Sequence, residues 1–94
     1  MDKFEAIESY LKRKFPNSTI QQKHDFDRDA QSFKLHLSDG TLLLKVGGEF
    51  AEDNSIEEIL RLFDQWALAE VLQQETELGV LVTQRGLETF RRGT

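Results

Sequence analysis

One dipeptide, Asp39-Gly40, constrains the fold of this chain more than any other feature. It lies between two segments in which apolar and polar residues alternate. An Asp-Gly pair in that setting favours a two-residue hairpin loop, because both loop positions need positive φ. The predicted pairs are Leu37 with Leu42, Leu35 with Leu44, and Phe33 with Val46. All six apolar residues then share one side of the hairpin, which we predict to be the core side.

A third strand is predicted upstream of this hairpin, over residues 19–26. Its alternation is looser, with Ile20 and Phe26 as the apolar members, and a short turn over residues 27–30 connects it to the hairpin. That turn pairs Ile20 with Leu37 and keeps Ile20 and Phe26 on the core side. The three strands form an antiparallel meander.

Two amphipathic helices flank the meander. The first begins after Asp2 as N-cap and ends just before Pro16, which cannot continue a helix. The second begins at Ser55, which forms an S-x-x-E capping box with Glu58, and runs to about residue 73. We predict both helices to pack on the apolar side of the sheet.

The remaining segments are less regular. We predict a loop over residues 49–53, a fourth short strand over residues 78–82, and a final helical turn or two over residues 83–90. The predicted fold is therefore α+β, a two-layer sandwich. Its antiparallel β-meander has α-β-β-β-α order plus a short C-terminal strand and helix.

Composition limits the class of protein. A chain of 94 residues with 38% hydrophobic and 31% charged residues suits one globular domain, here residues 1–94. The absence of cysteine excludes disulfides and thiolate metal sites. No apolar run approaches the length of a membrane helix or of a signal peptide, so we expect a cytoplasmic protein that does not bind membranes. A net charge of −5 argues against a broad nucleic-acid surface.

Three lysines form one candidate binding site. In the predicted register Lys23, Lys34 and Lys45 are direct lateral neighbours, one on each strand of the solvent face. Like charges placed opposite each other are mildly destabilising, so the row invites a functional reason. We predict that it binds an anion: an acidic segment of a partner, a phosphate or a nucleic-acid backbone. A solvated face, on which lysines prevent aggregation and pair with acids such as Asp25, is the simpler alternative.

Leu68 and Leu72 are the second candidate site. They lie one turn apart on the polar side of the second predicted helix and need a cover. The C-terminal segment, a second copy or a partner helix could provide that cover. We predict Leu68 and Leu72 as interface residues, with self-association as a homodimer among the options.

Catalysis has one weak candidate, a buried polar pair of His24 and Glu70. His24 projects toward the core side and Glu70 lies within the apolar stripe of the second helix, so the pair could transfer a proton. The two histidines themselves fall on opposite faces. No nucleophile motif is present, and we predict no enzymatic activity.

Metal binding has a partial motif only. Asp25, Asp27 and Asp29 are spaced as at the start of a calcium loop, but Ala30 replaces the required glycine and His36 replaces the bidentate glutamate. An acidic hairpin tip explains the three aspartates equally well. We predict no metal and no cofactor.

The α-β-β-β-α order resembles that of double-stranded RNA-binding domains, which contact phosphates through basic residues at the start of their second helix. At that place every charged residue of this chain is acidic and would repel phosphate, which argues against RNA binding of this kind: Glu49, Glu52, Asp53, Glu57 and Glu58. The order and acidity are also similar to those of small secretion chaperones. Together these features predict a small acidic protein-interaction or regulatory module. Nucleic-acid or anionic-ligand binding on the exposed sheet face is the first alternative, and a small enzyme is the second.

Overall fold

The computed structural model describes residues 2–92, which form four helices and five strands. The elements in chain order are α1 (Lys3–Lys14), β1 (Thr19–Asp25), β2 (Ala30–Leu37), β3 (Gly40–Gly47), α2 (Gly48–Asp53), α3 (Ile56–Gln65), α4 (Leu68–Gln74), β4 (Leu78–Thr83) and β5 (Gly86–Arg91). No helix within residues 2–92 is long and apolar enough to cross a membrane.

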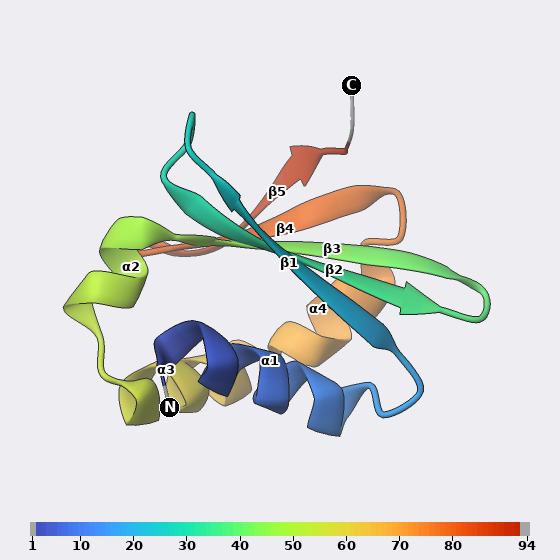
Figure 1. Cartoon of the computed structure of the whole chain (residues 1–94), viewed down its shortest axis with the longest axis horizontal. Helices are drawn as coiled ribbons and strands as arrows, with labels where there is room; N and C mark the ends of the chain where they lie inside the picture. The colour runs from blue at the N-terminus through green and yellow to red at the C-terminus, as the bar shows by residue number, and fades with distance from the viewer. Residues whose placement is uncertain (1, 93–94) are drawn as a thin grey trace.

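The strands form one open, mixed sheet in the order β1-β2-β3-β4-β5. Neighbouring strands are antiparallel except β3 and β4, which are parallel. A parallel pair needs a long crossover, and α2, α3 and α4 supply it. Figure 1 shows α1, α3 and α4 on one side of the sheet, with α2 at its end. The predicted α+β architecture, with helices layered on one face, is confirmed.

The core lies between the sheet and the helices. The predicted core-facing residues Phe33, Leu35, Leu44 and Val46 are all fully buried. From the helical layer, the largest buried side chains are Ile7, Leu11, Phe50, Ile59, Phe63, Leu68 and Leu72. Removing this apolar surface from water is the main stabilising contribution to the fold.

Both predicted helix starts are confirmed by their caps. The Asp2 carboxylate accepts the Glu5 backbone N–H at 2.7 Å, and α1 ends at the C-cap Phe15, just before Pro16. At α3 the Ser55 hydroxyl accepts the Glu58 N–H at 3.2 Å. The Glu58 carboxylate accepts the Ser55 N–H at 2.9 Å, which completes the capping box and lowers the pKa of Glu58.

The hairpin between β2 and β3 has the predicted faces but a different register. Leu37 pairs with Gly40, and Phe33 pairs with Leu44 rather than Val46. The loop is therefore Ser38-Asp39, and Gly40 is the first residue of β3 instead of the last residue of the loop. A shift of two residues keeps every side chain on its face, so the hydrophobic pattern cannot detect it.

The pairing of β1 with β2 is shifted in the same way. Ile20 pairs with Leu35 rather than Leu37, and it packs against the core as predicted. The prediction that Phe26 lies on the core side is wrong, because its side chain is 86% exposed. Strand β1 ends at Asp25, so Phe26 lies in the turn, where strand alternation no longer sets the direction of a side chain.

Two predictions for the part of the chain after β3 also need correction. Residues 49–53 belong to the short helix α2, which buries Phe50 and Ala51, rather than to a loop. The predicted strand over 78–82 is confirmed as β4, but the helical turn expected over 83–90 is strand β5. Thr83 pairs with Gly86 across a two-residue loop and thus turns the chain back along β4.

The second predicted helix is interrupted. Its first part, α3, ends at the C-cap Trp66, and Ala67 adopts the left-handed conformation with φ 52° and ψ 47°. A new helix, α4, then starts at Leu68. The break changes the direction of the helix and also changes which of its side chains face the sheet.

Candidate functional site

The face of the sheet opposite the helices carries a hollow of about 770 Å³, which we call the lysine hollow. It is lined by Gln21, Gln22, Lys23, Arg28, Ser32, Lys34, Leu43, Lys45, Phe90 and Arg91. Five of the lining residues are cationic and none is acidic, although one of the five, Lys45, is paired with Asp25 beside the hollow. On a chain of net charge −5, the hollow thus gathers five of the twelve lysine and arginine residues in one place.

The sheet register places the three predicted lysines on this face. Lys23 and Lys45 both pair with Ser32, one from each neighbouring strand, so they share one lateral row. Lys34 lies in the adjacent row, opposite Leu43. The prediction that all three are direct lateral neighbours is wrong, because it depended on the shifted register. The actual stagger brings the lysines into one hollow without placing like charges directly opposite each other.

Lys45 has two partners that fix its position. Its ammonium group lies 3.1 Å from the Asp25 carboxylate and 5.0 Å from the centroid of the Phe90 ring. The hydrogen bond from Lys45 lowers the pKa of Asp25. Lys45 is therefore held in place by a carboxylate and an aromatic face. Neither Lys23 nor Lys34 has an ion-pair partner within residues 2–92.

The charged and aromatic lining residues that escaped the sequence prediction are Arg28, Phe90 and Arg91. Phe90 lies across Gly79 of β4, where a Cβ atom would come within 2.2 Å of the ring. This glycine leaves room for the ring on the sheet surface, next to Lys45. The sequence carries one signal for strand β5. Gly86 follows the two-residue loop Gln84-Arg85 just as Gly40 follows the loop Ser38-Asp39, and the residues after Gly86 alternate.

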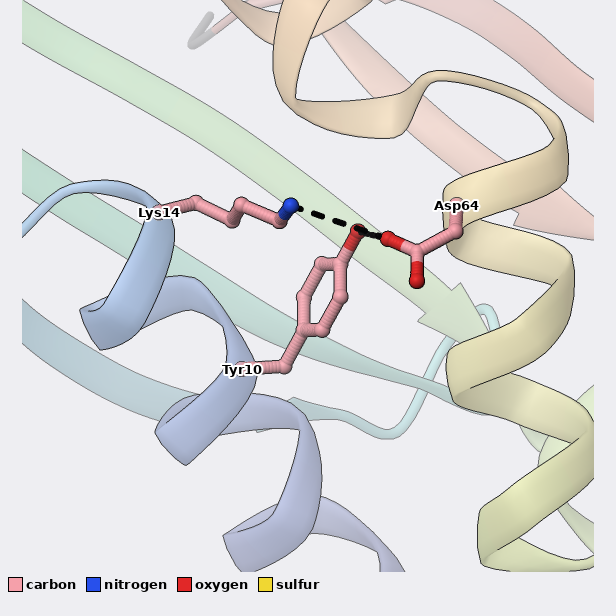
Figure 2. Close-up of polar contacts among 3 residues, drawn as sticks. All are labelled: Tyr10, Lys14 and Asp64. Atoms are coloured by element: carbon pink, nitrogen blue, oxygen red, sulfur yellow. Dashed lines mark hydrogen bonds and ion pairs between the residues drawn. The ribbon is translucent and has the colours of Figure 1, made fainter.

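A second polar cluster joins α1 to α3. Figure 2 shows Tyr10 and Lys14 of α1 reaching toward Asp64 of α3. The Tyr10 hydroxyl donates to the Asp64 carboxylate at 2.7 Å, and the Lys14 ammonium lies 3.7 Å from the same oxygen. Burial, followed by the hydrogen bond to Asp64 and its negative charge, raises the pKa of Tyr10. A phenol that holds its proton so firmly suits a structural contact better than proton transfer.

The predicted buried pair of His24 and Glu70 does not exist. Both side chains are exposed, His24 on β1 and Glu70 on α4. His24 instead lies 3.4 Å from the Gln31 amide oxygen and against the edge of the Phe26 ring. The prediction failed because β1 is an edge strand in which no residue is buried, and because α4, which carries Glu70, is a separate helix that buries Leu68 and Leu72 instead.

Leu68 and Leu72 are not interface residues. Their side chains are 0% and 1% exposed, inside the core of this chain. The break at Ala67 turns α4 so that its leucines face β3 and β4. Their cover is thus the sheet itself rather than a C-terminal helix or a second molecule.

The acidic turn provides no assembled metal site. Asp25 is committed to Lys45, and the backbone carbonyl of Asp29 accepts the Gly48 N–H at 2.8 Å. Within residues 2–92 no three metal-ligating side chains converge. No family model matches this chain, and no curated protein or solved structure matches it at a significant level.

Proposed function

We propose that this protein is a non-enzymatic interaction module whose lysine hollow binds an acidic segment of a partner protein. The observation that carries the proposal is the lining of the hollow, five cations and no carboxylate on an otherwise acidic chain. Charge of one sign concentrated in a hollow attracts the opposite charge and steers its approach.

The apolar part of the lining supports a peptide as the ligand. Leu43 and Phe90 lie among the cations and are only partly buried. A protein segment that presents acidic and apolar side chains on the same side can satisfy both parts of this surface. In an extended peptide, residues two apart share a side, so a pair of acidic residues followed by a pair of apolar residues does this. An isolated inorganic anion would leave the apolar part uncovered.

Fluorescence anisotropy with a labelled peptide in which pairs of glutamates alternate with pairs of leucines tests this function. We expect binding that weakens as salt screens the charges, and Lys34→Glu should weaken it at least about tenfold. Lys34 is exposed and has no ion-pair partner within residues 2–92, so its replacement should not unfold the protein.

Arg61→Glu is the matched control. Arg61 is exposed on α3, in the helical layer, and its replacement makes the same change of two charges far from the hollow. Affinity should stay close to that of the unchanged protein. Equal binding of a lysine–leucine peptide, or no effect of Lys34→Glu, would rule out this function.

Single-stranded nucleic acid is the second candidate ligand, because the Phe90 ring beside Lys45 could stack on a base. The net charge of −5 opposes a long polyphosphate more than a short acidic segment, because the charged backbone extends beyond the hollow over the acidic remainder of the molecule. An oligothymidylate and a heparin column distinguish the two ligands. Salt-sensitive retention on heparin, abolished by replacing Lys23, Lys34 and Lys45 together, would favour nucleic acid if the acidic peptide fails to bind.

A further inference from the structure

The turn between β1 and β2 exposes an aromatic side chain. Phe26 is the one large hydrophobic residue within residues 2–92 that is left strongly exposed, at 86%. Its ring contacts His24 at a centroid distance of 4.4 Å, which leaves most of its surface in water. An exposed aromatic side chain at the tip of a hairpin is a typical anchor for a protein interface.

The same turn carries negative charge. Asp27 and Asp29 flank Arg28, and neither aspartate forms an ion pair in the part of the chain that the structure describes. Asp25, at the end of β1, is already paired with Lys45. The turn thus presents the combination that the lysine hollow selects, an apolar side chain next to unpaired carboxylates.

The turn and the hollow lie on the same side of the molecule. In Figure 1 the turn after β1 rises from the sheet on the side away from α1, α3 and α4. Phe26 and Asp27 line a small depression together with Lys23 and Lys45, which face outward from the sheet. A surface with complementary parts on one face can pair with a second copy about a two-fold axis, since each contact then occurs twice.

We propose that two copies of this chain pair face to face, with the Phe26 turn of each copy entering the lysine hollow of the other. Phe26 would contact the Leu43 and Phe90 surface, and Asp27 would approach Lys34. The inference rests on the proposed function, because it assumes that the hollow recognises an acidic segment with an apolar side chain. It also implies that pairing regulates peptide binding, because a partner peptide and a second copy compete for the same hollow.

Light scattering over a range of protein concentrations tests the pairing. We expect the average mass to rise toward that of a dimer and to fall again with added salt. Phe26→Ala should keep the protein monomeric, and circular dichroism should show an unchanged fold because this side chain is exposed. Arg61→Glu, in the helical layer, should dimerise normally.

Charge reversal makes the test specific to the reciprocal arrangement. Asp27→Lys gives a copy whose turn and hollow are both positive. Lys23→Glu with Lys34→Glu gives a copy whose acidic turn meets two carboxylates in place of two lysines in the hollow. Each variant alone should be monomeric, while an equimolar mixture should form a heterodimer. Two variants that stay monomeric on mixing would overturn the proposal, as would a Phe26→Ala protein that still dimerises.

Peptide binding separates this inference from the proposed function. At concentrations where the protein is monomeric, Phe26→Ala should bind the glutamate–leucine peptide as the unchanged protein does. At higher concentrations it should bind more tightly than the unchanged protein, because no second copy competes. If the peptide binds but no dimer forms at any concentration, the pairing is wrong and the proposed function stands. If dimers form but the peptide does not bind, the proposed function is wrong.

Discussion

Tyr10 illustrates at the residue scale how one buried polar group joins two elements. Its ring is 3% exposed and packs against Phe63 of α3 at a centroid distance of 5.5 Å. Its hydroxyl group reaches Asp64, whose carboxylate remains largely hydrated because the side chain is 63% exposed. The contact therefore combines a buried aromatic ring with a hydrogen bond at the surface, and it ties α1 to α3 without leaving a charge buried.

Tyr10→Phe tests this contact and its pH dependence. We expect the free energy of unfolding near neutral pH to fall by about 1 kcal/mol, the usual contribution of one such hydrogen bond. The folded state raises the pKa of Tyr10, so the stabilisation is fully present below the unfolded pKa of 10.0. It declines as pH rises beyond that value, because the unfolded chain then loses the phenol proton while the folded chain keeps it.

Urea unfolding at several alkaline pH values, on both proteins, measures this difference. The gap between the unchanged protein and Tyr10→Phe should narrow above about pH 10. Because the chain has a single tyrosine, its near-ultraviolet absorbance reports the ionisation of Tyr10 alone. A gap that stays constant with pH, or tyrosinate absorbance that appears near pH 10 in the folded protein, would contradict the account.

At the scale of elements, the sequence patterns predicted what is local and missed what depends on distant contacts. The α1 caps, the capping box of Ser55 and the inward faces of β2 and β3 follow from spacings of a few residues. The register of the hairpin did not follow, because a two-residue shift leaves the hydrophobic pattern unchanged. The parallel pairing of β3 with β4 has no turn of its own that a sequence could reveal.

The candidate site was predictable to the same extent. Alternation alone puts Lys23, Lys34 and Lys45 on the solvent face, and the structure places them there. Phe90 and Arg91 join them only because β5 pairs with β4. The sequence pattern predicts a helical turn where β5 lies, so these two residues are not predicted for the site. The wrong interface at Leu68 and Leu72 followed from treating α3 and α4 as one continuous helix.

That break lies at Ala67, which adopts a conformation that suits glycine better than alanine. A left-handed residue with a Cβ atom costs about 1–2 kcal/mol, and glycine removes most of this cost at the expense of some unfolded-state entropy. We expect Ala67→Gly to stabilise the protein by about 0.5–1 kcal/mol and to raise Tm by a few degrees, measured by calorimetry.

The control for this prediction is Ala69→Gly, two residues further along and inside α4. Glycine in an ordinary helical position costs up to about 1 kcal/mol, so this variant should melt at a lower temperature than the unchanged protein. A rise in Tm for Ala67→Gly together with a fall in Tm for Ala69→Gly would locate the break at residue 67. If both variants lower Tm, then α3 and α4 are continuous in solution.

At the scale of the whole molecule, charge is divided between the two layers. Acidic residues occupy the first turns of α2 and α3, where they favour the helix dipole, and they leave the helical side negative. Lys23, Lys34 and Lys45 of the lysine hollow lie on the opposite side of the sheet. An acidic partner is therefore attracted to one face and repelled by the other, so that the layering orients its approach.

The same layering predicts how stability is distributed. Strand β3 lies at the centre of the sheet and buries Leu42, Leu44 and Val46 beneath the helices, so its amides open only when the core opens. Strand β1 lies at an edge, and none of its seven residues is buried. Local opening of β1 breaks few apolar contacts, so its amides should exchange at least about tenfold faster than those of β3, a difference of about 1.4 kcal/mol.

Residue-resolved hydrogen exchange by NMR measures this distribution directly. Strand β5, at the other edge, should also exchange faster than β3, although Gly86 at its start is buried. Binding of the glutamate–leucine peptide should slow exchange in β1 and β5 more than in β3, because the hollow spans strands that reach both edges and a ligand there holds them against the centre. Equal exchange rates in β1 and β3 would mean that the sheet opens as one unit, and the hollow would then have no mobile edge for a ligand to order.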